Sequence, residues 1–484
     1  MALREITELP CPPGLPILGN ARQIQPTRLH ALLEGWARDY GRLFRFKLLS
    51  ENVLVVNDHQ LLSELLRDRP EGLGRSKALR LTADELGAQG VFSAEGERWR
   101  THRKLVMRAL APEVVRHFYP TMERMTQRLL DRWNRALAEG RPVDVARDLK
   151  AWAMDITIAL SFGEDIDALD HDDDPLQKDV ELMFRMVGRR MILPVRYWNW
   201  LKLPIDREAD RMVERIDQRV RGFIADARAR MAAQPALRDK PSNMLEAMVV
   251  ARDEPDSGFT DEDIIGNTTT LVFAGEDTAA NTLGWLLYFL STHPEQTATA
   301  RAEVDRLLGD HRVAPDFACL QEMDYVEAAA NEAMRIKPVA PLAGFEVFKE
   351  RVVGDVRVPV GTRIFGLMRA AALDEAHFVD AHRFDPLRWL QSQAGQPTMQ
   401  QGSAQASPQA TTAIDSPARK VFPFGAGPRL CPGRYLAIAE IRLAASMILR
   451  NFDLSFDDDP ASIEEVFALT MTPDRLPVRL HPRP

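Results

Sequence analysis

A single cysteine in a loop rich in glycine and proline is the residue of this sequence best suited to chemistry. The loop reads FPFGAGPRLCPG over residues 422–433, and the apolar spacing that follows predicts a helix over residues 434–449. Amide N–H groups at the start of that helix, with the cation of Arg429, would favour a thiolate at Cys431. A thiolate in such a loop is either a metal ligand or a nucleophile. No second cysteine is close in sequence, which argues against zinc or an iron–sulfur cluster, and a single thiolate ligand on a haem iron fits better.

The same loop carries a family signature. Its pattern F-x-x-G-x-R-x-C-x-G, formed by Phe424, Gly427, Arg429, Cys431 and Gly433, resembles the haem-binding signature of the cytochrome P450 family. Ala437 and Glu440 extend the pattern in the same register. The resemblance implies that the cofactor is haem b (iron protoporphyrin IX), that Cys431 is its metal ligand, and that the five signature residues bind it. A structural cysteine beside a glycine turn is the alternative interpretation.

A long helix carries the second group of candidates. Its start is predicted at Thr260 by a capping pattern and its end at His293-Pro294, and about 32 residues at 1.5 Å each give roughly 48 Å. Almost every face is apolar or small, so the helix is expected to be buried, yet the stretch AGEDT at 274–278 contains two acids. It resembles the family's A-G-x-[DE]-T motif. The resemblance implies that Ala274 lies at the haem, that Gly275 opens the helix, and that Thr278 and Asp277 are catalytic, hydrogen-bonding oxygen and relaying protons. A kinked structural helix is the alternative.

Other motifs would position the cofactor. Trp99 and Arg103 lie on one face of a predicted helix, and W-x-x-x-R resembles the family's pair that hydrogen-bonds a haem propionate. Glu332 and Arg335 form E-x-x-R, which with Arg383 resembles the family's structural Glu-Arg-Arg triad. Many relatives have a propionate-binding arginine near position 345, where this chain has Phe345. Bacterial relatives that hydroxylate fatty acids also lack it, so the resemblance still implies haem binding and leaves the identity of all propionate contacts open.

Outside the central helix, the resemblance assigns four further segments to the substrate pocket. Residues 75–90 are predicted to form an irregular loop over the haem, although a surface loop fits the composition equally. Residues 182–200 match a mobile lid, although core packing explains the same residues almost as well. The candidate pocket residues of these and of the remaining segments are Leu79, Leu81, Leu86, Met183, Met186, Val187, Met191, Val339, Ala340, Leu342, Ala343 and residues 469–473.

Composition and length fit one large unit. The chain has 484 residues, 45% of them hydrophobic and 27% charged, and its net charge of -8 gives no reason to expect nucleic acid. Three cysteines suit a reducing cytoplasm, and no run approaches the roughly 20 apolar residues of a membrane span. The expected fold is mainly α with a small β-rich lobe, as one haem domain over residues 1–484. Residues 1–20 form a proline-rich N-terminal segment, and residues 391–418 are expected to be a disordered insertion.

The predicted function is a cytoplasmic haem-thiolate monooxygenase that inserts one oxygen atom from O2 into an apolar substrate, fatty-acid-like or terpenoid. The chain stops soon after its last predicted strands, so a separate electron donor is expected, either ferredoxin with its reductase or a flavodoxin. Arg100, Lys104 and Arg108 form a basic stripe on which an acidic donor would dock. An isomerase, dehydratase or peroxygenase of the same fold, or a haem sensor without enzymatic activity, stays open.

Overall fold

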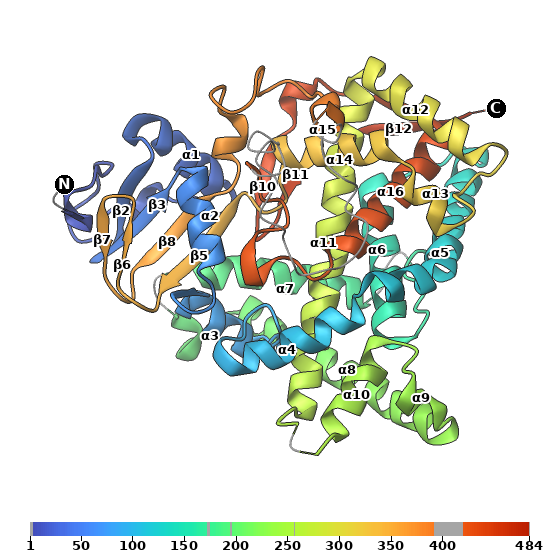
Figure 1. Cartoon of the computed structure of the whole chain (residues 1–484), viewed down its shortest axis with the longest axis horizontal. Coiled ribbons are helices and arrows are strands. Elements are labelled where there is room, and N and C mark those ends of the chain that lie inside the picture. Colours follow the sequence, from blue (N-terminus) through green and yellow to red (C-terminus); the bar gives the residue numbers. More distant parts are fainter. Residues whose placement is uncertain (1–2, 172–174, 194–195, 256, 392–419, 484) are drawn as a thin grey trace, which may run out of the picture.

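The computed structural model describes residues 3–171, 175–193, 196–255, 257–391 and 420–483 (Figure 1). A β-rich lobe at the N-terminal side joins a larger helical body, as predicted. The helix α11 (Asp261–Thr292) runs through the middle of the helical body. Among the described residues, no helix has both the length and the apolar character that crossing a membrane requires.

The helix predicted over residues 434–449 forms as α16 and continues to Asn451. Besides α11, the α-helices of the described residues are α1 (Leu29–Tyr40), α2 (His59–Arg67), α3 (Lys77–Glu85), α4 (Gly96–Ala109), α5 (Pro112–Ala138), α6 (Val145–Phe162), α7 (Pro175–Ile192), α8 (Pro204–Ala233), α9 (Ala236–Asp239), α10 (Met244–Asp253), α12 (Pro294–Leu308), α13 (Phe317–Gln321), α14 (Asp324–Ile336), α15 (Leu387–Gln391) and α16 (Arg434–Asn451).

The strands of the described residues form four small sheets. The largest has the order β2-β3-β8-β5-β4 and is mixed, since β3 and β8 are parallel and its other neighbours antiparallel. A second sheet has the order β1-β7-β6, and two-stranded ribbons join β10 to β11 and β12 to β9. The bounds are β1 (Arg4–Glu5), β2 (Leu43–Leu48), β3 (Glu51–Val56), β4 (Leu73–Gly74), β5 (Leu342–Val347), β6 (Arg351–Val353), β7 (Val356–Val358), β8 (Arg363–Leu367), β9 (Phe452–Phe456), β10 (Glu465–Phe467), β11 (Met471–Pro473) and β12 (Val478–Pro482).

The central helix begins as its capping pattern predicts. The Thr260 hydroxyl accepts a bond from the Asp263 N–H, and the Asp263 carboxylate accepts one from the Thr260 N–H. The helix is continuous from Asp261 to Thr292 and packs along α6. A Cβ on Gly275 would lie 2.3 Å from the Thr157 hydroxyl of α6, so the glycine permits this close helix contact. Gly275 therefore has a packing role that the motif alone does not indicate.

The prediction of an irregular loop over residues 75–90 is wrong, because α3 occupies much of it. Ser76 caps this helix by accepting a bond from the Leu79 N–H at 3.3 Å. Leu79, Thr82 and Ala83 form its buried face, at helical spacing. Leu79 and Leu86 pack in the main hydrophobic core rather than on the surface.

The N-terminal segment is folded onto the β-rich lobe. Residues Arg4–Glu5 add β1 to a sheet beside β7, and the buried Asn20 side chain donates to the carbonyls of Pro12 and Pro13. These bonds hold the proline-rich stretch as a tight loop. The expected insertion at 391–418 lies outside the described residues, apart from Gln391, which ends α15.

The buried charge cluster forms with one member changed. Arg335 and Glu332 make two side-chain hydrogen bonds of 2.8 Å, and both side chains are fully buried. The second arginine is Arg388, whose Nε donates to Glu332 Oε1 at 2.9 Å, whereas Arg383 is exposed and contributes only its carbonyl oxygen. The assignment of Arg383 is therefore wrong. Arg388 approaches Glu332 because α15 packs against α14, a tertiary contact that spacing does not reveal.

Candidate active site

The cysteine loop is shaped by a glycine that no other residue could replace. Gly427 has φ +71°, and a Cβ there would lie 2.7 Å from the Leu66 carbonyl oxygen at the end of α2. The loop closes where the Cys431 N–H donates to the Phe424 carbonyl at 2.9 Å. Gly433 precedes the first residue of α16, and its Cβ position would lie 4.0 Å from Cys431 Sγ. The sulfur is thus held at the N-terminus of a long helix.

Burial raises the pKa of the Cys431 thiol above its ordinary value. The backbone N–H groups of Gly433 and Arg434 and the charges of Arg103 and Arg434 act in the opposite direction. The predicted helix donors are therefore present and act in favour of the thiolate, against the effect of burial. The cations that act on the sulfur are Arg103 and Arg434 rather than the predicted Arg429, whose guanidinium bonds to Ala94 and Glu95. A cation bound at the sulfur would reverse the balance, because a coordinating thiol is deprotonated.

The predicted pair on α4 lies beside this loop. Trp99 is buried, and the guanidinium carbon of Arg429 lies 4.7 Å from the centre of its ring. Arg103 Nη2 donates to the Leu430 carbonyl at 2.6 Å, next to the cysteine. Burial lowers the pKa of Arg103, against the effect of Cys431, and the group stays cationic at neutral pH.

Arg429 gives a test of whether these residues fit a haem. Its Nη2 donates to the Ala94 carbonyl at 2.8 Å and to the Glu95 carboxylate at 2.5 Å. Its Nε and Nη1 are buried, and neither has a hydrogen-bond partner among the described residues. Unpaired buried guanidinium nitrogens are costly and suit carboxylates, such as the propionates of a haem. A thiol, an indole and two guanidinium groups together match that cofactor.

The acid and alcohol of α11 have distinct environments. Ala274 is exposed and Thr278 half-buried, whereas Glu276, Asp277 and Ala279 of the same helix are buried. One face of α11 is therefore open there. The Thr278 hydroxyl donates to the Ala274 carbonyl at 2.7 Å, which leaves its oxygen able to accept a bond. These two side chains share the open face.

Asp277 contacts two residues, of which the sequence predicted one, Thr470, only as part of a pocket segment. Its carboxylate accepts a hydrogen bond from the Thr470 hydroxyl, and its Oδ1 lies 3.4 Å from Lys150 Nζ of α6. Burial alone would lower the pKa of Lys150, but the carboxylates of Asp277, Glu276 and Glu181 raise it. Thr470 falls in the expected pocket segment 469–473, whereas nothing in the sequence around Lys150 marks it. The acid therefore has both a donor and a cation in contact.

Two of the predicted pocket segments meet at this point. The Met471 N–H donates to the Val339 carbonyl at 2.8 Å, which joins the β10–β11 turn to the chain that leads into β5. Leu469 in that turn has φ +131°, a strained value for a residue with a branched side chain. The turn thus brings Thr470 to Asp277.

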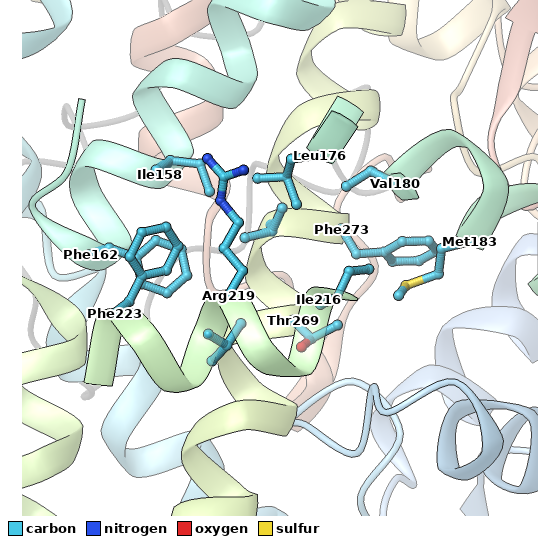
Figure 2. A pocket seen from close by; sticks show the side chains of 12 residues that line it. Ile158, Phe162, Leu176, Val180, Met183, Ile216, Arg219, Phe223, Thr269 and Phe273 are labelled. Atoms are coloured by element: carbon cyan, nitrogen blue, oxygen red, sulfur yellow. The ribbon is translucent and has the colours of Figure 1, made fainter. Parts of the chain in front are cut away.

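The lid residues on α7 pack inside the protein. Met186 and Val187 are buried in the main core, and Met183 lines a cavity of about 20 Å³ (Figure 2). The cavity is also lined by Thr269 and Val272 of α11. At 100° per residue, Thr269 and Val272 lie on the side of α11 opposite Ala274 and Thr278. The cavity therefore lies on the side of the helix away from its open face. The contacts favour core packing for these α7 residues.

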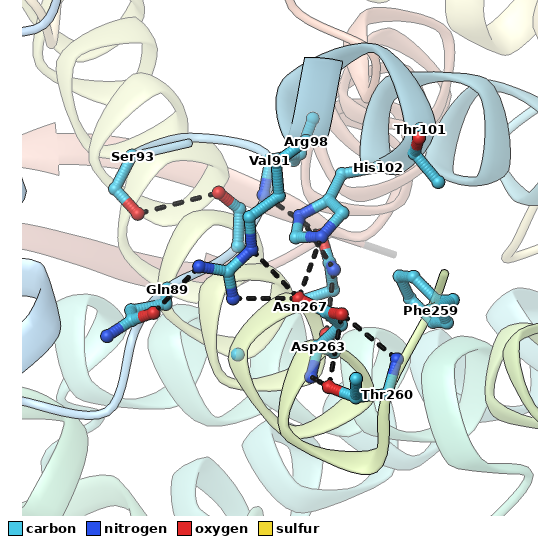
Figure 3. A network of polar contacts seen from close by, with 12 residues as sticks. Gln89, Val91, Ser93, Arg98, Thr101, His102, Phe259, Thr260, Asp263 and Asn267 are labelled. Carbon is cyan, nitrogen blue, oxygen red and sulfur yellow. Dashed lines mark hydrogen bonds and ion pairs between the residues drawn. The ribbon is translucent and has the colours of Figure 1, made fainter. Parts of the chain in front are cut away.

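A polar network around the buried residues His102, Asp263 and Asn267 fixes α4 against the start of α11 (Figure 3). His102 Nε2 lies 3.1 Å from Asp263 Oδ1, and Arg98 donates to the same oxygen at 2.7 and 2.9 Å. Asn267 Nδ2 lies 3.2 Å from His102 Nδ1, and Asn267 Oδ1 accepts from the Val91 N–H at 2.9 Å. Since the amide nitrogen is a donor, Nδ1 must accept and the proton lies on Nε2. The network orients the helix that carries Trp99 and Arg103.

Comparison with known proteins gives a consistent family. A family model described as cytochrome P450 matches residues 9–479. A probable cytochrome P450 of Drosophila melanogaster is 26% identical over 93% of this chain and 88% of its own length. The human mitochondrial 25-hydroxyvitamin D-1 alpha hydroxylase is 27% identical over 93% of this chain and 87% of its own. A self-sufficient cytochrome P450 monooxygenase of Aspergillus kawachii is 25% identical over 99% of this chain, which spans only 43% of that relative.

Proposed function

The chain belongs to the cytochrome P450 family and is a haem-thiolate monooxygenase, and on this basis we propose which residues act and on which class of substrate. When bound, the haem supplies the chemistry of O2 activation, which uses electrons from a donor. Cys431 would be its thiolate ligand, and Trp99, Arg103 and Arg429 would bind its propionates. Ala274 and the rest of the loop signature, Phe424, Gly427 and Gly433, would border the ring.

The observation that carries this assignment is the position of Cys431. Its sulfur lies at the N-terminus of α16 and receives backbone N–H groups, within reach of the charge of Arg103. Two nitrogens of Arg429 in the same loop are buried without a partner among the described residues. One thiolate ligand and donors for carboxylates are the two requirements of a thiolate-ligated haem.

Asp277 and Thr278 would supply protons for oxygen activation. The Thr278 oxygen can accept a hydrogen bond on the open face of α11, and the Asp277 carboxylate is held by Thr470 and Lys150. Lys150 is about one quarter exposed, so it links the buried acid to solvent. A proton supply is what an isomerase, a dehydratase or a passive haem sensor would not need, so these contacts favour a monooxygenase.

We infer that the substrate is an apolar organic molecule, fatty-acid-like or terpenoid. The segment from Val339 to Ala343 is apolar apart from its backbone, and it adjoins the β10–β11 turn. The electron donor would be a ferredoxin with its reductase, or a flavodoxin, and the enzyme would act in the cytoplasm. These finer assignments rest on the residues rather than on any relative.

A reduced carbon monoxide difference spectrum tests the ligand. The wild-type protein should show the Soret shift typical of a thiolate ligand, and Cys431→His should lose that shift while it retains haem. Oxygen uptake that depends on NAD(P)H, measured with a ferredoxin system and a panel of apolar compounds, tests the reaction. A wild-type protein that binds haem without the thiolate-type shift would refute the assignment of Cys431.

A further inference from the structure

Two arginines outside the signature lie beside the arginine of the cysteine loop. Both come from the connection between α2 and α3, where Arg69 is only 5% exposed and Arg75 is half-buried. Arg69 Nε donates to the Leu66 carbonyl at 3.3 Å, and Arg69 Nη2 lies 3.5 Å from the Ala426 carbonyl of the cysteine loop. Arg75 Nε donates to the Phe92 carbonyl at 2.9 Å. These contacts anchor both side chains mainly through neutral carbonyls.

Glu95 is the carboxylate whose charge acts on all three arginines. It pairs with Arg429 and accepts the Arg75 backbone N–H at 2.6 Å. Burial and the neighbouring cations lower the pKa of Arg69 to about 10 and that of Arg75 to about 9, and all three arginines stay cationic at neutral pH. Three cations around one carboxylate repel one another in a desolvated place. The cluster therefore favours a further anion.

Arg69 places a positive charge beside Phe345. The guanidinium carbon of Arg69 lies 5.3 Å from the centre of the Phe345 ring, a contact within cation–π range. Phe345 is buried in β5, and its ring therefore supports a cation that comes from a different part of the chain. A positive charge is thus present beside position 345 although that residue is apolar.

We propose that Arg69 and Arg75 bind the propionate carboxylates of the haem together with Arg429, and that they replace a cation at position 345. Glu95 orients Arg429 and leaves two positive charges for the two propionates. This inference rests on the proposed function, because it requires that the haem lies against the cysteine loop. It concerns residues that no signature of the sequence marks.

The test compares haem with its dimethyl ester, in which both carboxylates are masked. In the haem-loaded full chain, Arg69→Gln and Arg75→Gln should each speed haem transfer to excess apomyoglobin by about tenfold. The reduction potential should also become more negative, because a cation near the iron is lost. In the chain loaded with the dimethyl ester, the same substitutions should have little further effect. Lys77→Gln, an exposed neighbour on α3, is the matched control and should behave as wild type.

Every outcome of this experiment either supports or overturns the proposed role of Arg69 and Arg75. Equal acceleration of loss for haem and for the ester would assign the arginines a purely structural role, and no acceleration with either would also overturn the proposal. If a glutamine variant fails to load haem, Arg69→Lys and Arg75→Lys carry the same comparison with the charge retained but the paired donors lost. A wild-type spectrum without the thiolate-type shift would instead refute the function on which the proposal rests.

Discussion

Asp277 has the contacts that a proton-delivering acid needs. Its carboxylate accepts from Thr470 and lies near Lys150, while Thr278 on the next position of α11 has an oxygen free to accept. A buried acid in a mostly apolar helix is costly unless it is paired. Here the pairing comes from α6 and from the β10–β11 turn, so two elements outside α11 hold one carboxylate. We propose that this arrangement sets the proton supply on the open face of α11.

The Thr278 hydroxyl can be tested by its removal. Thr278→Ala should leave substrate-induced spectral shifts unchanged, because the hydroxyl is not needed for the apolar pocket. Peroxide released per NAD(P)H consumed should rise several-fold, since general acid–base groups contribute on the order of 10²–10⁴ to such steps. Thr278→Ser, which keeps the hydroxyl, serves as the control and should stay close to wild type. Unaltered coupling in Thr278→Ala would remove this residue from the proposed role.

At the scale of elements, sequence reasoning succeeded where the signal was local. The cap at Thr260 and the cysteine loop are defined by residues close in sequence, and both form as expected. It failed at Arg388 and did not single out Lys150, because their partners are distant in sequence and only helix packing brings them together. The missed helix α3 had a usable signal in its serine cap and its 3–4 spacing of buried residues.

The network between α4 and α11 predicts a pH dependence of stability. Burial lowers the pKa of His102, as does the charge of Arg98, while Asp263 acts in the opposite direction. The folded state therefore resists a proton that the unfolded chain accepts near pH 6.5. The stability that the neutral ring contributes is complete above that pH. It falls as pH decreases below it, by at most about 1.4 kcal/mol per pH unit.

Denaturant unfolding of wild type and His102→Asn between pH 5 and 7.5 checks this expectation. Protonation would place a hydrogen on His102 Nδ1, where it would face the amide nitrogen of Asn267, itself a donor. The Asn267 amide is held in this orientation because its oxygen accepts the Val91 N–H. The asparagine variant is less stable but lacks this titration, so the difference between the two proteins should shrink toward acid pH. Asp263 titrates only at lower pH, because the Thr260 N–H and Arg98 outweigh burial and lower its pKa. A constant difference would rule out His102 as the titrating group.

For the whole molecule, the arrangement of α4 relates the buried site to the surface. Arg103 contacts the cysteine loop, whereas Lys104 and Arg108 of the same helix are exposed. Neither of these two has a carboxylate partner among the described residues. Arg100, predicted as part of the same basic stripe, is paired with Glu97 and Glu71. The uncompensated part of the stripe is therefore smaller than predicted, and it lies on the helix that contacts the cysteine loop.

An acidic electron donor docked on Lys104 and Arg108 would approach the site by the side of the cysteine. Reversing both residues to glutamate should slow ferredoxin-supported reduction about tenfold at low salt, and the difference should shrink as salt is added, because steering by exposed charges is screened. Arg207→Glu with Lys240→Glu changes the net charge equally on exposed residues at the two ends of the α8–α9 region, and this control should reduce at the wild-type rate. An equal slowing of both double variants would show that net charge alone governs the encounter. Unchanged kinetics at low salt would place the donor on another surface.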